Sequence, residues 1–158
     1  MNKYFISPLL AIIAFLLTAT SCLTHGLEPL DTYDGSDIES FHSVSFRKLG
    51  PNTLPNGELK VKDYDLKLTE QKIDKESKSA SVNVALPSNF PTQEIDPNEV
   101  KLSELVVRLN ISTAATLEPL SDAPALGKPG DWSKPHQYLI TAADGSTSRW
   151  TVTLRFVK

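Results

Sequence analysis

Trp132 is the residue whose surroundings in the sequence come closest to a ligand-binding pattern. The stretch "GDWSKPHQ" places Asp131, Lys134 and Gln137 around it. An exposed indole ring can stack against a sugar while such polar groups bind its hydroxyls, which is the usual mixture of apolar platform and polar side chains in a ligand site. On this interpretation Tyr64 is a further contact residue. The alternative is that Trp132 is buried and plugs one end of the core.

No other group of residues has the spacing of a reactive site. His25, His42 and His136 are far apart in the sequence, and none has a second histidine or a cysteine at a metal-ligand spacing. The sequence contains no nucleophile elbow, Walker loop or dinucleotide fingerprint. We therefore expect no metal site, no cofactor and no enzymatic activity.

The composition is that of one globular domain with a core of ordinary size. The 158 residues are 40% hydrophobic and 22% charged, with a formal net charge of −3. Charges of one sign form no long block, so we expect neither a nucleic-acid partner nor an acidic interaction tail.

The first 22 residues carry the most specific targeting signal. Lys3 precedes an apolar run from Tyr4 to Leu17, which is shorter than the ~18–20 residues that span a bilayer as a helix. Small residues in "TATSC" then lead to the only cysteine, Cys22. This arrangement resembles the lipobox of bacterial lipoproteins, although Ala19 stands where that motif usually has Leu. The alternative is an ordinary secreted protein in which Cys22 has no such role.

Three segments follow from this interpretation. We expect a signal peptide over residues 1–21, a lipidated Cys22 with a flexible tether over residues 22–37, and a folded domain over residues 38–158. Acylation of Cys22 would anchor the domain to a membrane. The predicted location is the cell envelope, as an outer-membrane lipoprotein facing either the periplasm or the cell surface.

Apolar and polar residues alternate in several short runs, as expected for strands that bury one face. A first strand is predicted over residues 38–48, and the Gly- and Pro-rich stretch "LGPNTLPNG" is predicted to end it. In the next stretch, "ELKVKDYDLKL", Leu59 and Val61 share one phase and Tyr64 belongs to the other. This change of phase predicts a bulge or two short strands.

The later runs follow the same rule. A turn at "DKES" precedes strict alternation from Ala80 to Leu86, and "DPNE" predicts a helical turn with Asp96 as its N-cap. A closing hairpin surrounds "ADGS", because Gly accepts the positive φ that tight turns need. The inward residues predicted for the last strands are Leu105, Val107, Leu109, Ile111, Tyr138, Ile140, Ala142, Trp150, Val152, Leu154 and Phe156. The predicted fold is all-β, an immunoglobulin-like β-sandwich of about seven antiparallel strands.

Three stretches are similar to a known family. The runs "KIDKESKSASVNVALP", "LSELVVRLNISTAATLEP" and "DWSKPHQYLITAADGSTSRWTVTL" resemble the Ig-like (cadherin-like) β-sandwich modules of lipoproteins from gut-dwelling Gram-negative bacteria, over roughly residues 72–157. The matching positions are Leu102, Leu105, Ile111, Ser112, Ala115, Thr116, Pro119, Tyr138, Thr141, Ala142, Asp144, Gly145, Ser146, Trp150, Val152 and Thr153. The resemblance implies a non-catalytic module. It also implies that Trp132 is the plug, since the family commonly has a Phe there.

The predicted function is binding or adhesion by a non-catalytic, lipid-anchored envelope module, with glycan capture as the favoured form. The alternative is a structural or assembly role, in which an edge strand pairs with an envelope protein. An exposed aromatic cluster at the loop end would favour glycan capture, and a bare apolar edge strand would favour assembly. The expected partners are the membrane through Cys22 and either a glycan or an envelope protein.

Overall fold

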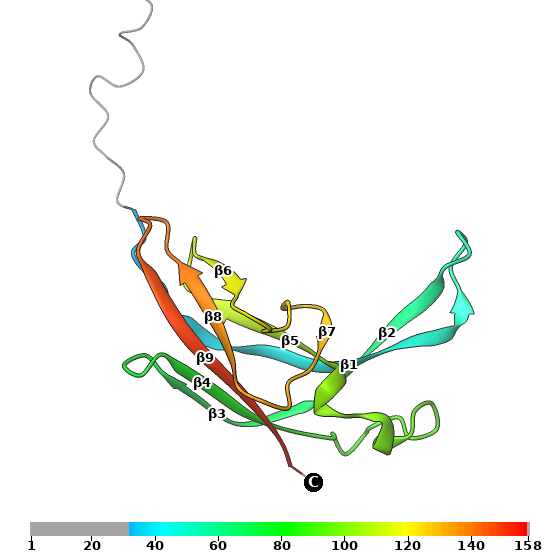
Figure 1. Ribbon diagram of the computed structural model, residues 1–158. Coiled ribbons are helices and arrows are strands. Elements are labelled where there is room, and N and C mark those ends of the chain that lie inside the picture. The colour runs from blue at the N-terminus through cyan, green and yellow to red at the C-terminus, as the bar shows by residue number, and fades with distance from the viewer. Residues whose placement is uncertain (1–31, 158) are drawn as a thin grey trace, which may run out of the picture. The chain divides into compact units, whose positions relative to one another are not determined.

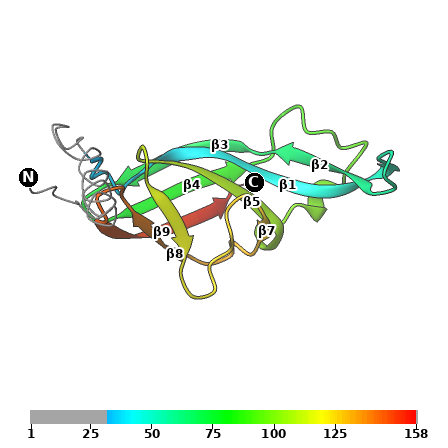
Figure 2. The same ribbon diagram turned by 90° about the horizontal axis from the view of Figure 1, so that it is seen from above.

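The structure, a computed structural model, describes residues 32–157. Within them almost every element is a strand, and the strands form two sheets that pack against each other (Figure 1, Figure 2). One sheet has the order β2-β1-β5-β7, and the other has the order β3-β4-β9-β8-β6. The predicted all-β sandwich is therefore confirmed. The described part of the chain has no helix of the length and hydrophobicity needed to cross a membrane.

Two short 3₁₀ helices interrupt the strands, and the first is the predicted helical turn. Its N-cap, Asp96, accepts a hydrogen bond through Oδ1 from the N–H of Asn98 at 2.9 Å, and Pro97 takes the first helical position. The elements of residues 32–157 are β1 (Ile38–Thr53), β2 (Leu59–Asp65), β3 (Lys67–Asp74), β4 (Ser79–Ala85), η1 (Pro97–Glu99), η2 (Leu102–Glu104), β5 (Leu105–Ile111), β6 (Thr116–Pro119), β7 (Pro129–Gly130), β8 (His136–Thr141) and β9 (Thr147–Phe156).

The core consists of the alternating apolar residues of both sheets. In β4, Val82 and Val84 are buried as their phase predicted, and in β9 Trp150 and Val152 are buried in the same way. Full burial of such a side chain stabilises the fold by about 1.5–3 kcal/mol. Val106 is buried as well, although its phase points to the outer face.

One pair of strands departs from the antiparallel expectation. β4 and β9 run parallel, with Ala80 opposite Val152 and Val82 opposite Leu154. Alternation in a sequence specifies which face of a strand is buried, but it does not specify the direction of the neighbouring strand. The parallel pair therefore has no signal in the pattern of apolar residues.

β1 is longer than predicted, and its two halves pair with different strands. It pairs with β5 from Ile38 to Phe46 and with β2 from Ser45 to Thr53. Its second half therefore extends beyond β5, and together with β2 it forms a two-stranded projection (Figure 1, Figure 2). We call residues 47–63 the arm.

The sequence feature expected to end β1 instead lies inside the arm. Gly50 and Pro51 lie where the register of β1 and β2 shifts, between Leu49 and Thr53. A Pro is tolerated at such a place, because among residues 32–157 no strand pairs there with the edge of β1 that lies opposite β2. The chain turns back only at Gly57, whose φ of +84° suits glycine.

Residues 33–37, which the sequence assigned to the tether, lie against the sandwich. The carbonyl of Ser36 accepts a hydrogen bond from Nε1 of Trp150 at 3.0 Å, and the N–H of Asp37 donates to Oγ of Ser112 at 3.0 Å. The carboxylate of Asp37 pairs with Lys78 at 2.6 Å. The boundary of the folded part thus moves from residue 38 to about residue 33. The predicted signal peptide, Cys22 and the first part of the tether lie outside the described residues.

Removal of residues 32–37 tests this boundary. A domain that begins at residue 38 should have a free energy of unfolding about 1–3 kcal/mol lower than one that begins at residue 32, because Trp150 and Lys78 lose hydrogen-bond partners. Urea titrations followed by tryptophan fluorescence measure the difference. Equal midpoints and slopes would show that the segment is a tether, as first predicted.

Candidate functional site

Trp132 lies in the core and not on the surface. Its side chain has 0% exposure, and its Nε1 donates a hydrogen bond to the carbonyl oxygen of Leu105 at 3.1 Å. Its ring stacks on Tyr138, with ring centroids 6.1 Å apart, and lies nearly perpendicular to the ring of His136 at 5.5 Å. Trp132 therefore cannot present a ring face to a ligand, which corrects the platform interpretation. Of the two alternatives predicted for Trp132, the structure shows the buried plug.

The polar residues predicted to act with Trp132 are on the surface but do not form a site. The carboxylate of Asp131 accepts a hydrogen bond from the backbone N–H of Ser133 at 2.9 Å. Hydrogen bonds from the side chain and the backbone of Ser133 lower the pKa of Asp131. Lys134 pairs with Asp122, and Gln137 is exposed on β8. Because the indole ring of Trp132 is buried, it gives these groups no exposed apolar platform.

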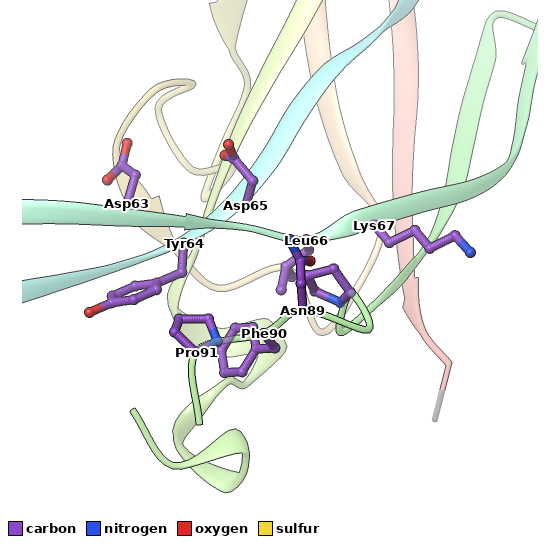
Figure 3. Close-up of a pocket in the computed structure, with 9 residues that line it drawn as sticks. Asp63, Tyr64, Asp65, Leu66, Lys67, Asn89, Phe90 and Pro91 are labelled. Atoms are coloured by element: carbon purple, nitrogen blue, oxygen red, sulfur yellow. The ribbon is translucent and has the colours of Figure 1, made fainter. Parts of the chain in front are cut away.

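Tyr64, the remaining predicted residue, lies on β2 in the wall of a cavity of about 470 Å³. Figure 3 shows Tyr64 on the same side of β2 as Phe90 and Pro91, whereas the carboxylates of Asp63 and Asp65 point to the opposite side. The ring centroids of Tyr64 and Phe90 are 6.2 Å apart. We call this cavity the Tyr64–Phe90 groove; its other lining residues are Leu66, Lys67, Pro87 and Asn89.

Polar groups surround the other side of Tyr64. Its hydroxyl donates to Oε2 of Glu94 at 3.2 Å, and Lys62 pairs with the same carboxylate. The Lys62 ammonium also lies 5.1 Å from the centroid of the Tyr64 ring. A second cavity of about 380 Å³ opens here and is lined also by Lys60 and Asn52. Because Tyr64 is only 9% exposed, it offers a small part of its ring to either cavity.

The carboxylate of Asp63 joins three strands on the outer face of the sheet. Its Oδ1 accepts from Nε of Arg47 at 2.7 Å, and its Oδ2 accepts from Arg47 at 3.0 Å and from Arg108 at 2.7 Å. We call this group the Asp63 clamp. The hydrogen bonds from Arg47, together with those from Arg108, lower the pKa of Asp63 to about 2. A carboxylate held ionised by two guanidinium groups is a poor proton acceptor near neutral pH, so its role is structural.

No metal centre is formed by the described part of the chain, where no three His, Cys, Asp or Glu side chains lie close enough together to hold an ion. The surfaces of residues 32–157 that could contact a ligand or partner include the two open cavities beside Tyr64 and the surface of the arm.

The arm carries most of the large apolar side chains that the described residues expose. Leu49 and Val61 are cross-strand neighbours with exposures of 59% and 50%, and Leu59 is 45% exposed. We call these three residues the apolar stripe; Leu54, near the turn, is 41% exposed. Clusters of exposed apolar side chains mark interaction surfaces. This site was missed in the sequence, where its only signal was that Val61 is out of phase with Tyr64.

The sequence profile of the DUF5018-related family matches residues 38–153. The match begins at the first residue of β1 and ends within β9, so it includes strands of both sheets and the whole arm. No curated protein matches the chain.

The crystal structures that match this chain include two from Bacteroides species. A protein from Bacteroides fragilis NCTC 9343, described as secreted, is 32% identical with a TM-score of 0.70, and the match covers 81% of this chain and 100% of that one. Since the whole of that chain is matched, the fold forms there without a further domain. A protein from Bacteroides thetaiotaomicron VPI-5482, described as a glycoside hydrolase, is 20% identical with a TM-score of 0.44 over 84% of this chain and 28% of that one. The second likeness is too weak to carry an argument.

Replacement of Trp132 tests whether it is a plug. Trp132→Ala should lower the free energy of unfolding by about 3–5 kcal/mol, because it leaves a cavity in the core and removes the donor to Leu105. Trp132→Phe should cost less, since a ring still fills the space. Urea unfolding of both variants measures these differences. A Trp132→Ala protein as stable as the parent would contradict the buried position.

Proposed function

The chain belongs to the DUF5018-related family, and from this premise we propose that it is a non-catalytic, lipid-anchored immunoglobulin-like module of the cell envelope. In this proposal the module pairs with a partner protein through its arm. The signal-like run and Cys22 support export and acylation, with the outer membrane as the proposed place of anchoring. The relative from Bacteroides fragilis is described as secreted, which supports a location in the envelope or outside the cell.

The observation that carries the proposal is that the apolar stripe lies beside a strand edge that no other strand of residues 32–157 covers. β2 is the last strand of its sheet, and Leu59 and Val61 project from it into solvent. A segment of a partner that paired with β2 would gain backbone hydrogen bonds and would cover both side chains. A two-stranded ribbon alone is marginally stable in water, so the arm gains stability from an added strand.

The other sheet edges are less suited to pairing. β3 is interrupted at Glu70, which has a φ of +49° and lies at a register shift against β4. β6 has four residues and ends at Pro119, and β7 has two residues, one of which is Pro129. Bulges, short length and Pro all hinder strand addition. β2 contains neither Pro nor Gly, and its two lysines, Lys60 and Lys62, restrict the range of partners without closing the edge.

Glycan capture is a second candidate, and the Tyr64–Phe90 groove supports it. Aromatic rings beside polar groups are a usual lining of small-molecule sites, and here Lys67 and Asn89 supply the polar groups. This candidate ranks second because Tyr64 is mostly buried and Trp132 has no exposed face.

Site-specific crosslinking tests the arm. A photo-crosslinking amino acid in place of Val61 in the full chain, expressed in Bacteroides cells, should form an adduct with a protein, because this side chain lies on the pairing edge. The control is the same amino acid in place of Glu118, an exposed residue of the edge strand β6, which should form none. Gel electrophoresis and mass spectrometry detect and identify adducts. Absence of any protein adduct at position 61 would contradict the proposal.

A glycan array tests the groove. If the domain binds a glycan there, Phe90→Ala should weaken binding about tenfold, since contacts between aromatic rings and their partners contribute ~0.5–1.5 kcal/mol beyond the buried area. The matched control is Tyr33→Ala, which removes an exposed aromatic ring that does not line the groove. Failure to bind any glycan, or equal binding by the Phe90→Ala protein, would eliminate this candidate.

A further inference from the structure

The free edge of β2 exposes a definite set of backbone groups. The N–H of Leu66 donates to the carbonyl of Val44 in β1 at 2.9 Å. Because the direction of these groups alternates along a strand, the N–H and C=O groups of Leu59 and Val61 point away from β1. Among residues 32–157 no strand lies on this side of β2. The two residues therefore offer both hydrogen-bonding groups and apolar side chains to the same occupant.

We propose that the occupant is a second copy of this chain, an inference that rests on the proposed function of the arm. The two β2 strands pair antiparallel about a two-fold axis at Lys60. Leu59 then lies opposite the partner's Val61, and Val61 lies opposite the partner's Leu59. Each of these pairs exchanges two backbone hydrogen bonds, and the two apolar stripes become neighbours on one face of a four-stranded ribbon.

The charges on the other face of β2 favour this register. Lys62, whose ammonium pairs with Glu94 of its own chain, comes opposite the partner's Glu58, and symmetry repeats the contact, so each ammonium gains a second carboxylate as neighbour. One like-charge contact remains, between Lys60 and the partner's Lys60. A shift to an axis at Val61 would place Lys60 against the partner's Lys62 twice and Leu59 against the partner's Asp63. That register places like charges opposite each other and places apolar residues opposite carboxylates. Both kinds of contact are unfavourable.

The shape of the arm allows the two copies to meet. β2 runs from the tip of the arm at Leu59 toward its base at Asp65, so antiparallel pairing places the two sandwiches at opposite ends of the ribbon (Figure 1). The other edge of the arm is unsuited to the same contact, because β1 contains Gly50 and Pro51 at its register shift, and Pro has no N–H to donate.

The pairing segment is short, so the dimer is weak in dilute solution. An interface of this kind buries less than the area of about 1,200 Å² that stable complexes usually need. Two copies anchored in one membrane are held at a high effective concentration, which compensates for a weak contact. The dimer is thus suited to linking modules that share a membrane.

Disulfide trapping tests the register in the domain of residues 32–158, which contains no cysteine and corresponds to the fold that forms by itself in the Bacteroides fragilis relative. At the two-fold axis Lys60 and the partner's Lys60 form a non-hydrogen-bonded pair, with Cα atoms about 4.5 Å apart, which a disulfide can span. Lys60→Cys should therefore form a linked dimer under mild oxidation. Lys62→Cys is the matched control on the same face; its Cα atoms lie about 14 Å apart in the dimer, so it should not link.

Sedimentation equilibrium of the domain without cysteine gives the second readout. The parent domain should dimerise reversibly, and Val61→Lys should weaken the dimer by at least about tenfold, since it places two charges in the apolar pairs. Val61 is exposed, so this variant should fold normally, which circular dichroism checks. A parent domain that stays monomeric, together with no linkage of Lys60→Cys, would overturn the proposal. Linkage of Lys62→Cys without Lys60→Cys would overturn the register.

The crosslink at position 61 separates this inference from the proposed function. An adduct between two copies of the chain would support both. An adduct formed solely with a different protein would support pairing through the arm and overturn the second copy as its occupant. Absence of an adduct would overturn both.

Discussion

The Asp63 clamp is the interaction on which the projecting part of the molecule depends. Asp63 belongs to β2, Arg47 to β1 and Arg108 to β5, so one carboxylate ties the base of the arm to the sheet from which it extends. Arg108 also donates to the hydroxyl of Ser45 at 3.3 Å. Because the pKa of Asp63 is about 2, the clamp stays ionised at neutral and mildly acidic pH. The free edge is therefore presented in a fixed direction, which lowers the entropy cost of pairing.

The two faces of the arm have different roles as a result. On the inner face, Lys48 pairs with Glu99 at 2.5 Å and Lys62 pairs with Glu94, so the connector between β4 and β5 lies across the base of the arm. Exposed ion pairs of this kind contribute little stability each, but they occupy the side chains that point inward. On the outer face no segment of the described chain covers Val61, so the apolar stripe is left for a partner.

The sandwich could be predicted from the sequence because alternation reports burial directly. Val152 lies in the core, and Gly145 has the positive φ that its turn requires. Alternation assumes, however, that a second sheet covers the strand. Val61 belongs to a strand that extends past that sheet. The sequence pattern therefore indicated the phase of Val61 but not its exposure. Trp132 shows the converse: its polar neighbours are on the surface, and sequence alone leaves the direction of its ring undetermined. Of the predicted site residues, Tyr64 lines a cavity and Trp132 is buried in the core.

Amide hydrogen exchange at Leu59 and Val61 tests the central claim, that the free edge of β2 is a pairing site, most directly. The measurement compares the isolated domain at low concentration with the full chain at high density on vesicles. The account predicts that these two N–H groups exchange freely in the first state and are protected in the second, while Leu105, in the core, exchanges equally slowly in both. Free exchange of Leu59 and Val61 in both states would contradict it.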